Sequence, residues 1–382
     1  MEITEWQIGR LEVPNGESEV VNFLKREFEP KGLDPIWFEE YFSWKVGPLN
    51  PGGKGYLFVV YASGKVLACL SLAVKKALFN GQEIKTAEFG DAYCSNLFFE
   101  NIKYYKPAAL HPDFSDNPNA YVNKSPFGRL AYEATKAAIS DGIHFLYGTP
   151  NNNAFPGWIN RLGHFHLTSH NVYVFFRPTI YFYSKKISMP SAMRNVLSVL
   201  DWVLNYMLQI LQTDVFSKKI IISEKVPSVE ELNVLWDKTR INKGFTILRD
   251  GNYWLHRYFS HPLKKYLTYS IYTAGEFAGL VVFCVENNGG SKRARLMEWM
   301  LHPSLKSSYV FASVIRKIMR GSFDYCITYC DKNDKDAVAL RKNLFFHHNH
   351  QVTMTFYRNI YCHPDSMIYM IRNFYMGNTD AA

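Results

Sequence analysis

The stretch NKSPFGRLAYEATKAAISDG, residues 123 to 142, has the residue order of a capped helix that begins at an anion site. Ser125 is a favoured N-cap, and Pro126 suits the first helical position, where its missing N–H costs nothing. The free N–H groups of the first turn, with Lys124 and Arg129, would bind a phosphate or a carboxylate. The alternative is an ordinary capped surface helix whose charges are solvated.

A second polar stretch follows the strand expected at residues 143 to 148. Asn151, Asn152 and Asn153 offer neutral hydrogen-bond donors and acceptors, and Trp158 offers a flat aromatic surface. The alternative is a turn that is rich in Asn because Asn tolerates left-handed backbone and caps helices, with Asn153 as the N-cap.

These two stretches resemble the coenzyme A half of a GNAT acyltransferase domain, and in particular the two-domain GNAT proteins of bacterial surface-glycan gene clusters. In that family the fifth strand ends in Gly-x-Pro-Asn, followed by Tyr or Phe, Pro, Gly and later Leu-Gly. The corresponding residues here are Gly148, Pro150, Asn151, Phe155, Pro156, Gly157, Leu162 and Gly163. The segments RDGNYWLHRYFSHPLKKY and NFYMGNTD resemble the second, degenerate GNAT copy of the same proteins.

The resemblance implies a pantetheine arm held between the fourth and fifth strands, which splay apart. It implies coenzyme A contacts from Asn123, Lys124, Ser125, Phe127, Gly128, Arg129, Asn151 and Asn153, and acceptor contacts from Asn152, Trp158, Arg257 and Glu298. Two departures stand out. The usual Arg/Gln-x-x-Gly-x-Gly/Ala phosphate loop has lost at least one glycine at residues 123 to 125. Ile159 stands where many GNAT proteins have a Tyr that protonates the leaving thiolate, so that acid role is not carried over.

The fourth strand would be GDAYCSNLFF, residues 90 to 99. Backbone N–H groups from Tyr93 to Ser95 would polarise the thioester carbonyl, and Asp91 and Tyr93 are candidates for taking a proton from the incoming ammonium. The alternative for Asp91 is a residue that begins the strand and bonds neighbouring backbone. We reject Cys94 as a nucleophile, because no His is evidently placed to activate it.

The second half lacks a Pro-capped anion helix and an Asn-rich turn, so we expect it to grip the acceptor without binding coenzyme A. Arg257 and Glu298 are its candidate functional charges, because a buried carboxylate needs a partner or a task. The alternative is a structural Arg–carboxylate pair. His347, His348 and His350 lack partners at metal spacing and are interpreted as surface residues.

Both halves show the same order of hairpin strands, helix, strand, helix and strand, which predicts a duplicated α/β domain. Hairpins are expected around Ser63-Gly64 and Asn80-Gly81, and Gly142 should end the first central helix. The fold class is α/β (α+β), with two tandem GNAT-like domains and mixed sheets flanked by helices. We predict an acyl-CoA domain at 1–190, a connecting helix and linker at 191–225, which includes the approach to a capping box at Ser228 and Glu231, and an acceptor domain at 226–382.

Charge and cysteine content limit the function classes. The formal charge of +9 is diffuse, without a basic tail, which argues against a nucleic-acid partner. Six single cysteines and a start, MEITEWQIGR, without a signal-peptide pattern predict a reduced, cytoplasmic protein. We expect no metal site, and Cys326 and Cys330 should share one face of a buried strand.

The segment RNVLSVLDWVLNYMLQILQ, residues 194 to 212, is nearly long enough to span a bilayer. Polar residues recur along one stripe of it, and a spanning helix would have to bury Asp201. We therefore expect a connecting helix packed on both domains and no integral membrane segment. The alternative is a helix that lies on a membrane surface.

The resemblance implies an acyltransferase that moves an acetyl or short (hydroxy)acyl group from acyl-CoA to a nucleotide-linked amino sugar, for lipopolysaccharide or capsule. One alternative is a Fem-type transferase that uses aminoacyl-tRNA, for which a helical arm and stronger basic patches would be expected. The other is a non-catalytic GNAT-like scaffold. The acyl group, the sugar and the oligomeric state are not decided by the sequence.

Overall fold

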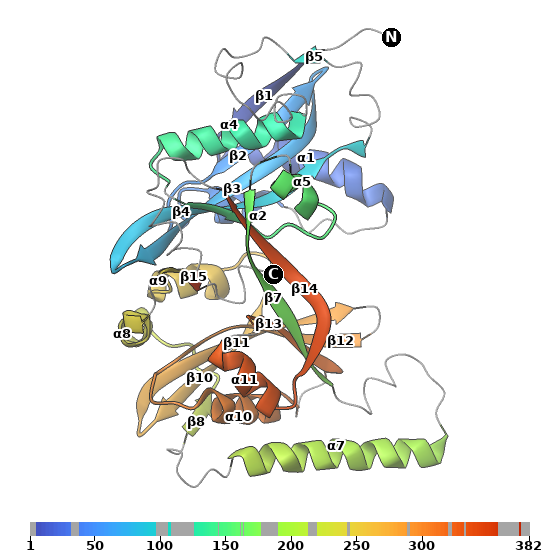
Figure 1. Ribbon diagram of the computed structural model, residues 1–382, viewed down its shortest axis with the longest axis vertical. Coiled ribbons are helices and arrows are strands. Elements are labelled where there is room, and N and C mark those ends of the chain that lie inside the picture. Colours follow the sequence, from blue (N-terminus) through green and yellow to red (C-terminus); the bar gives the residue numbers. More distant parts are fainter. Residues whose placement is uncertain are drawn as a thin grey trace.

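The structure is a computed structural model. It describes residues 5–31, 38–96, 106–107, 126–143, 145–160, 162, 164–176, 190–212, 220–242, 245–288, 291–319, 323–331, 334–357 and 374–375. Asn123, Lys124 and Ser125 lie outside these ranges. The molecule is elongated, with one half above the other and a long helix along its lower end (Figure 1).

The first half contains β1 (Glu5–Leu11), α1 (Glu17–Phe28), α2 (Glu39–Val46), β2 (Tyr56–Ala62), β3 (Lys65–Phe79), β4 (Gln82–Cys94), β5 (Lys106–Pro107), α4 (Pro126–Ser140), β6 (Phe145–Gly148), α5 (Phe155–Asn160) and β7 (His164–Phe176). The long helix α7 (Ser191–Gln212) follows. The second half contains β8 (Ile220–Ser223), α8 (Val229–Thr239), β9 (Phe245–Ile247), α9 (Gly251–Trp254), the π-helix η5 (Leu255–Phe259), β10 (Tyr266–Thr273), β11 (Glu276–Asn288), β12 (Ser291–Leu301), α10 (Ser307–Met319), β13 (Tyr325–Cys330), α11 (Lys335–Lys342), β14 (Phe346–Tyr357) and β15 (Phe374–Tyr375).

Local sequence signals explain several element ends. Ser63 and Gly64 have φ angles of 51° and 70°, and Asn80 and Gly81 have φ angles of 49° and 80°. Both pairs therefore form the left-handed two-residue turns that right-twisted hairpins favour, and the two predicted hairpins are confirmed.

Helix ends also follow the sequence. The first central helix begins at Pro126, and Gly142 follows its last residue with a φ angle of 77°, as predicted. The capping box is present, because Ser228 and Glu231 exchange hydrogen bonds between their side chains and backbone N–H groups.

The predicted α/β class and the repeated element order are both confirmed. The order β2, β3, β4, α4, β6, α5, β7 in the first half recurs as β10, β11, β12, α10, β13, α11, β14 in the second. Helices cover both faces of the sheet in each half. The predicted domain boundaries stay a prediction.

The final strands of the two copies are exchanged. β14 from the second half pairs antiparallel with β6 of the first half, and β7 from the first half pairs antiparallel with β13 of the second. β7 and β14 also pair with each other, so the described strands join one 15-stranded sheet. These two long strands cross the middle of the molecule side by side (Figure 1). The exchange hydrogen-bonds each half to the other.

Each half has apolar clusters on both faces of its sheet. In the first half, Leu72 and Leu130 belong to the cluster beneath α4, and Phe42 and Leu57 belong to the cluster beneath α1 and α2. In the second half, one cluster lies against α10 and α11 and another against α8, α9 and η5. Cys326 and Cys330 both lie in the former, as their spacing predicted.

Helix α7 departs from its predicted packing. It contacts α10, chiefly on the side that carries the buried Leu197, and it leaves large apolar side chains exposed on its other faces. The expectation that it packs on both domains is wrong. The helix is amphipathic, but its apolar face is wider than its contact with the protein. Among the helices in the described ranges, none is long and apolar enough to cross a membrane.

Candidate active site

The parallel strands β4 and β6 separate at one end of their pairing. Paired residues run from Thr86 with Phe145 to Phe89 with Gly148, and the ladder ends there. Beyond Phe89, β4 continues beside β3 as far as Cys94, while the chain leaves β6 and turns toward α5. The ladder ends because β6 ends at Gly148, and the resemblance implies a splay of the two strands at this place. A strand edge that is no longer paired with its neighbour can hydrogen-bond an extended ligand as an added strand would.

A β-bulge interrupts β4 at the same place. Asp91 and Ala92 together lie opposite Leu70 of β3, and the φ angle of Asp91 is 48°. A bulge of this kind changes the direction of the backbone groups that follow it. The bulge therefore sets the orientation of the last residues of β4, where backbone donors to a reacting carbonyl were predicted.

The alternating direction of the backbone N–H groups along β4 identifies one of those donors. The Ser95 N–H donates to the Leu67 carbonyl at 2.9 Å, so it points toward β3. Because successive N–H groups of a strand point in opposite directions, the Cys94 N–H points toward the side that β6 has left. Ser95 itself is only 1% exposed. The donor predicted between Tyr93 and Ser95 is thereby narrowed to the Cys94 N–H.

The carboxylate of Asp91 is held by side chains from two other elements. It accepts hydrogen bonds from Lys45 Nζ at 2.7 Å and from Ser71 Oγ at 2.6 Å, with Tyr41 Oη at 3.4 Å. Burial alone would lower the pKa of Lys45, but the surrounding acidic groups, of which Asp91 has the largest effect, together outweigh burial and raise it. The pair therefore fixes the bulge to α2. The proton-accepting role of Asp91 stays a prediction.

Tyr93 and Cys94 project to opposite faces of β4. The Tyr93 hydroxyl donates to Glu27 at 3.4 Å, and its ring packs against Phe23 and Phe28 of α1. Cys94 packs against the cluster beneath α4. Burial, followed by the charge of Glu27, raises the pKa of the Cys94 thiol to about 12. The thiol is therefore protonated at neutral pH, which supports its rejection as a nucleophile.

The Asn-rich turn begins the helical segment that leads into α5. Asn151 Oδ1 accepts from the Ala154 N–H at 2.9 Å, and the Asn151 carbonyl accepts from the Phe155 N–H at 2.9 Å. The capping residue is therefore Asn151, and the expectation that Asn153 is the N-cap is wrong. Asn152 and Asn153 are exposed beside it. All three amides lie just after the point where β6 separates from β4.

Trp158 fixes α5 to the sheet. Its ring is 5% exposed and packs against Phe89, Phe127 and His164, with ring centroids 5.0, 6.2 and 4.6 Å away. The contact with Phe89 matters most, because Phe89 is the last paired residue of β4. Trp158 thus packs against the last residue of β4 that pairs with β6. Its predicted contact with the acceptor stays a prediction.

Helix α4 begins near this point, as predicted. Phe127 in its first turn contacts Trp158, and Gly128 is buried against the sheet. The Arg129 guanidinium lies 5.4 Å above the ring of Trp6, which directs it toward β1. The coenzyme A contacts predicted for these three residues stay predictions. So does the phosphate contact of residues 123 to 125, which lie outside the described residues.

The charges predicted in the second half have different surroundings. Glu298 is 2% exposed and accepts hydrogen bonds from Arg249, from Tyr253 at 2.9 Å and from Tyr258 at 2.6 Å. This is the structural Arg–carboxylate pair considered from the sequence, with Arg249 as the partner. The predicted contact of Glu298 with the acceptor stays a prediction.

Arg257 lies where the second half touches α2. Its guanidinium is 5.7 Å above the ring of Trp44 and 5.8 Å above that of Tyr258. The Trp44 indole also donates to the His256 carbonyl at 2.9 Å and stacks on the His256 ring. Within the described ranges, no carboxylate forms an ion pair with Arg257. A half-buried guanidinium between aromatic rings is suited to an anionic group of a ligand.

The histidines beside Arg257 add no positive charge at neutral pH. Burial, and then the charge of Arg257, lower the pKa of His256 to about 4 and that of His261 to about 3. The rings of both histidines contact Trp44. Sequence analysis did not single out Trp44 or Lys45. The spacing of Tyr41 and Lys45, four residues apart on one helix, was the available signal.

In the second copy, the start of the helix that corresponds to α4 is hydrogen-bonded to a carboxylate of the protein itself. The Trp299 indole of β12 donates to the Asp336 carboxylate at 2.7 Å, and Ser307 Oγ at the first residue of α10 donates to the same carboxylate at 2.7 Å. α10 takes the place of α4 in the repeated order, and a helix N-terminus favours an anion. The side chain at the first residue of α10 is therefore hydrogen-bonded to an internal carboxylate.

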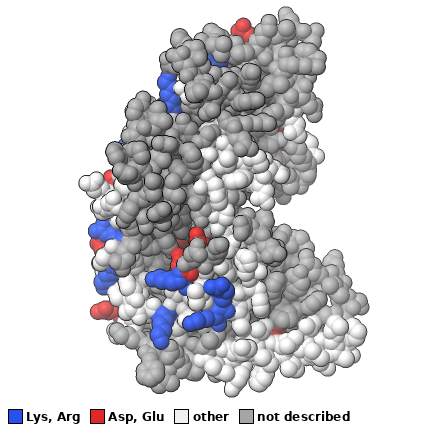
Figure 2. All heavy atoms as spheres, in the orientation of Figure 1, with Lys and Arg blue, Asp and Glu red and all other residues white. Residues whose placement is uncertain are grey.

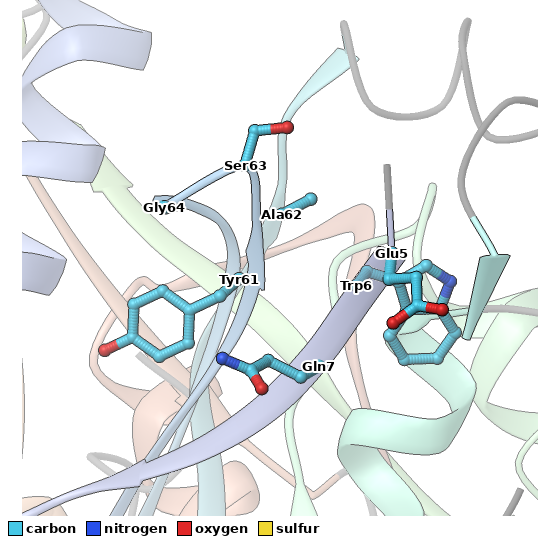
Figure 3. Close-up of a pocket in the computed structure, with 7 residues that line it drawn as sticks. All are labelled: Glu5, Trp6, Gln7, Tyr61, Ala62, Ser63 and Gly64. Atoms are coloured by element: carbon cyan, nitrogen blue, oxygen red, sulfur yellow. The ribbon is translucent and has the colours of Figure 1, made fainter. Parts of the chain in front are cut away.

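The described residues hold a depression away from the predicted site and no metal centre. A depression of about 440 Å³ lies at the edge of β1 and the tip of the β2–β3 hairpin (Figure 3), lined by Glu5, Trp6, Gln7, Tyr61, Ala62, Ser63 and Gly64. None of the predicted site residues lines it. No group of three or more His, Cys, Asp and Glu side chains in the described ranges is arranged to hold a metal ion.

Comparison with known proteins identifies the fold. No protein-family model and no curated protein sequence matches the chain. Among solved structures, N-myristoyltransferase of Saccharomyces cerevisiae with bound myristoyl-CoA has a TM-score of 0.59 at 11% identity, over 99% of this chain and 89% of that one. GCN5-related N-acetyltransferases from Anabaena variabilis and Kribbella flavida have TM-scores of 0.54 and 0.53, at 13% and 9% identity, over 92% of this chain and 72% and 71% of theirs. The chain has the GNAT fold.

Proposed function

We propose that this chain is a coenzyme A-dependent N-acyltransferase. It transfers an acetyl or short (hydroxy)acyl group from acyl-CoA to the amino group of a nucleotide-linked amino sugar, such as a dTDP- or UDP-linked amino-deoxyhexose made for lipopolysaccharide or capsule. The observation that carries the proposal is the separation of β4 from β6 beyond Phe89 and Gly148, with the Cys94 N–H directed into it. The likeness to a structure with bound myristoyl-CoA supports an acyl-CoA donor.

The donor would lie along the open edge of β4. The amides of its pantetheine arm are neutral donors and acceptors, which suits the backbone of this edge and the amides of Asn151 and Asn153. Its pyrophosphate would lie at the N-terminus of α4, close to Lys124 and Ser125. The filled position at Asp336 in the second copy supports one donor site for each chain.

The acceptor would reach the thioester from the side of α2 and η5. Arg257 is the half-buried cation of this region, and it lies over Trp44, one residue before Lys45. A nucleotide-linked sugar carries a pyrophosphate, which a guanidinium binds with two parallel hydrogen bonds. Asn152 is exposed at the turn after β6 and would contact the sugar hydroxyls.

The reaction is a direct transfer. The neutral amine attacks the carbonyl carbon of the thioester, so the C–N bond forms and negative charge develops on the carbonyl oxygen. The Cys94 N–H is directed to stabilise that oxygen. The C–S bond then breaks, and the proton that the attacking nitrogen gives up is taken up by the thiolate to give free coenzyme A. Asp91 or Tyr93 would take the earlier proton, the one that the incoming ammonium loses to become the neutral amine. Holding both reactants together supplies much of the acceleration.

Release of free thiol from acyl-CoA tests this function. Acetyl-, hydroxybutyryl- and myristoyl-CoA would each be offered with dTDP- and UDP-linked amino sugars, with the same sugars lacking the nucleotide, and with a peptide that has a free N-terminus. The proposal predicts thiol release that depends on the nucleotide-linked amino sugar and favours the shorter donors. Thiol release with the peptide alone would overturn the amino-sugar acceptor, and no release with any pair would overturn the acyltransferase.

A further inference from the structure

The outer face of α7 is apolar along its whole length. Its large exposed side chains are Met193, Val196, Val199, Leu200, Trp202, Tyr206, Met207 and Ile210, each between 43% and 64% exposed. At 100° per residue these positions cover about half of the helix circumference. None of them carries a charge, and a contiguous exposed apolar face of this size marks an interaction surface.

The helix lies at the end of the molecule, where it can meet a plane. It forms the lower edge of the ribbon, with α10 above it (Figure 1). In the same orientation, spheres of uncharged residues dominate the described part of this edge (Figure 2). The positions opposite the buried Leu197 include Trp202 and Tyr206, whose rings stack at 5.6 Å and are 64% and 51% exposed.

We propose that α7 is a membrane-surface helix that holds the protein on an anionic lipid bilayer. Trp and Tyr prefer the boundary between headgroups and acyl chains, and an uncharged apolar face on a helix that does not span is the pattern of an interfacial helix. The net charge of +9 is complementary to an anionic surface. In the sequence, lysine pairs at 185–186 and 218–219 flank the helix on both sides.

A second copy of the chain fits the apolar face of α7 less well than a bilayer does. The helix has 22 residues, so its apolar face is about 33 Å long and about 10 Å wide, or about 330 Å² for each copy. A stable protein–protein interface buries about 800 Å² on each partner. The face is also wider than the two positions per heptad that a helix pair uses. A bilayer matches both its width and its flatness.

Vesicle sedimentation of the full chain tests the proposal. The vesicles would contain phosphatidylcholine alone, or phosphatidylcholine with about 30% phosphatidylglycerol. Val199→Glu with Trp202→Glu places two charges on the apolar face. Ser191→Glu with Ser198→Glu places two charges on the exposed polar stripe, outside the apolar face, and it is the matched control. All four side chains are exposed, so both variants should fold, which circular dichroism checks.

We expect the wild-type chain to sediment with the anionic vesicles, and the apolar-face variant to bind them about tenfold or more weakly. The control variant should bind within about threefold of wild type. A wild-type chain that stays in the supernatant with both vesicle types overturns the proposal without reference to any variant. A dimer in solution that the apolar-face variant dissociates also overturns it, because a second copy then covers the face.

Discussion

The Trp299 indole donates a hydrogen bond to the carboxylate of Asp336 at 2.7 Å, and this contact distinguishes the two copies of the fold. Both copies have the same element order, and the second places this carboxylate against the first residue of α10, the helix that follows its central hairpins. In the first copy, the described residues leave the edge of β4 open beyond Phe89. The second copy is therefore closed at this position by its own side chains, whereas the described part of the first copy leaves a strand edge open.

Replacing Trp299 tests that closure. Trp299→Phe keeps an aromatic ring but removes the donor to a buried carboxylate, so we expect the free energy of unfolding to fall by about 1.5 to 3 kcal/mol. Urea unfolding measures it, with Trp202→Phe on the exposed face of α7 as a control that should change stability little. Equal stability of Trp299→Phe and wild type would show that the contact does not hold the second copy closed.

Replacing Asp91 tests the link between the bulge and α2. Asp91→Asn leaves Lys45 charged and largely buried without its carboxylate, while Asn still tolerates the left-handed backbone there. We expect a loss of about 3 kcal/mol in the free energy of unfolding. The double variant Lys45→Met with Asp91→Asn removes both charges and should recover part of that loss. A single variant as stable as wild type would refute the structural role of the pair.

Arg257→Met tests the acceptor side. The variant removes the half-buried guanidinium over Trp44, so the KM for a nucleotide-linked acceptor should rise about tenfold or more, while the affinity for coenzyme A stays unchanged. Arg240→Met is the control, because Arg240 pairs with Asp237 on the surface. Kinetics give the KM and calorimetry gives the affinity. An unchanged KM would remove Arg257 from the acceptor site.

Because His164 is buried in its neutral form, we expect the free energy of unfolding to fall in acid. The side chain is 4% exposed, and burial lowers its pKa to about 3. Between the unfolded pKa of 6.5 and the folded value, the unfolded chain binds a proton that the folded chain does not, so stability falls as the pH falls. His164→Gln should reduce this slope by about 1.4 kcal/mol per pH unit between about pH 6 and 4. Urea unfolding at several pH values measures it, and identical slopes would contradict the assignment.

Local features of the fold could be predicted because short-range chemistry decides them. The turns at Ser63-Gly64 and Asn80-Gly81 need left-handed backbone, and the start of α4 at Pro126 follows from a residue that suits only the first helical turn. The repeated element order was also visible, because the alternation of apolar residues marks each strand and helix.

The exchange of β7 and β14 could not be predicted in the same way. The residue pattern of a strand tells which face is buried, but it does not identify the neighbouring strand. The contact between Trp44 and His256 joins residues that are 212 positions apart, and Arg249 was not distinguishable as the partner of Glu298. The exposure of the apolar face of α7 could not be predicted for the same reason, since an apolar stripe does not reveal what covers it.

The most direct test of the central claim is calorimetric titration of the protein with coenzyme A, acetyl-CoA and ATP. We predict one coenzyme A bound to each chain, similar binding of acetyl-CoA and none of ATP. Ser125→Glu, which places a charge directly before α4, should abolish that binding, and Ser191→Glu at the start of α7 should not. Two coenzyme A molecules per chain, binding that Ser125→Glu leaves unchanged, or no binding of coenzyme A or acetyl-CoA would contradict the account.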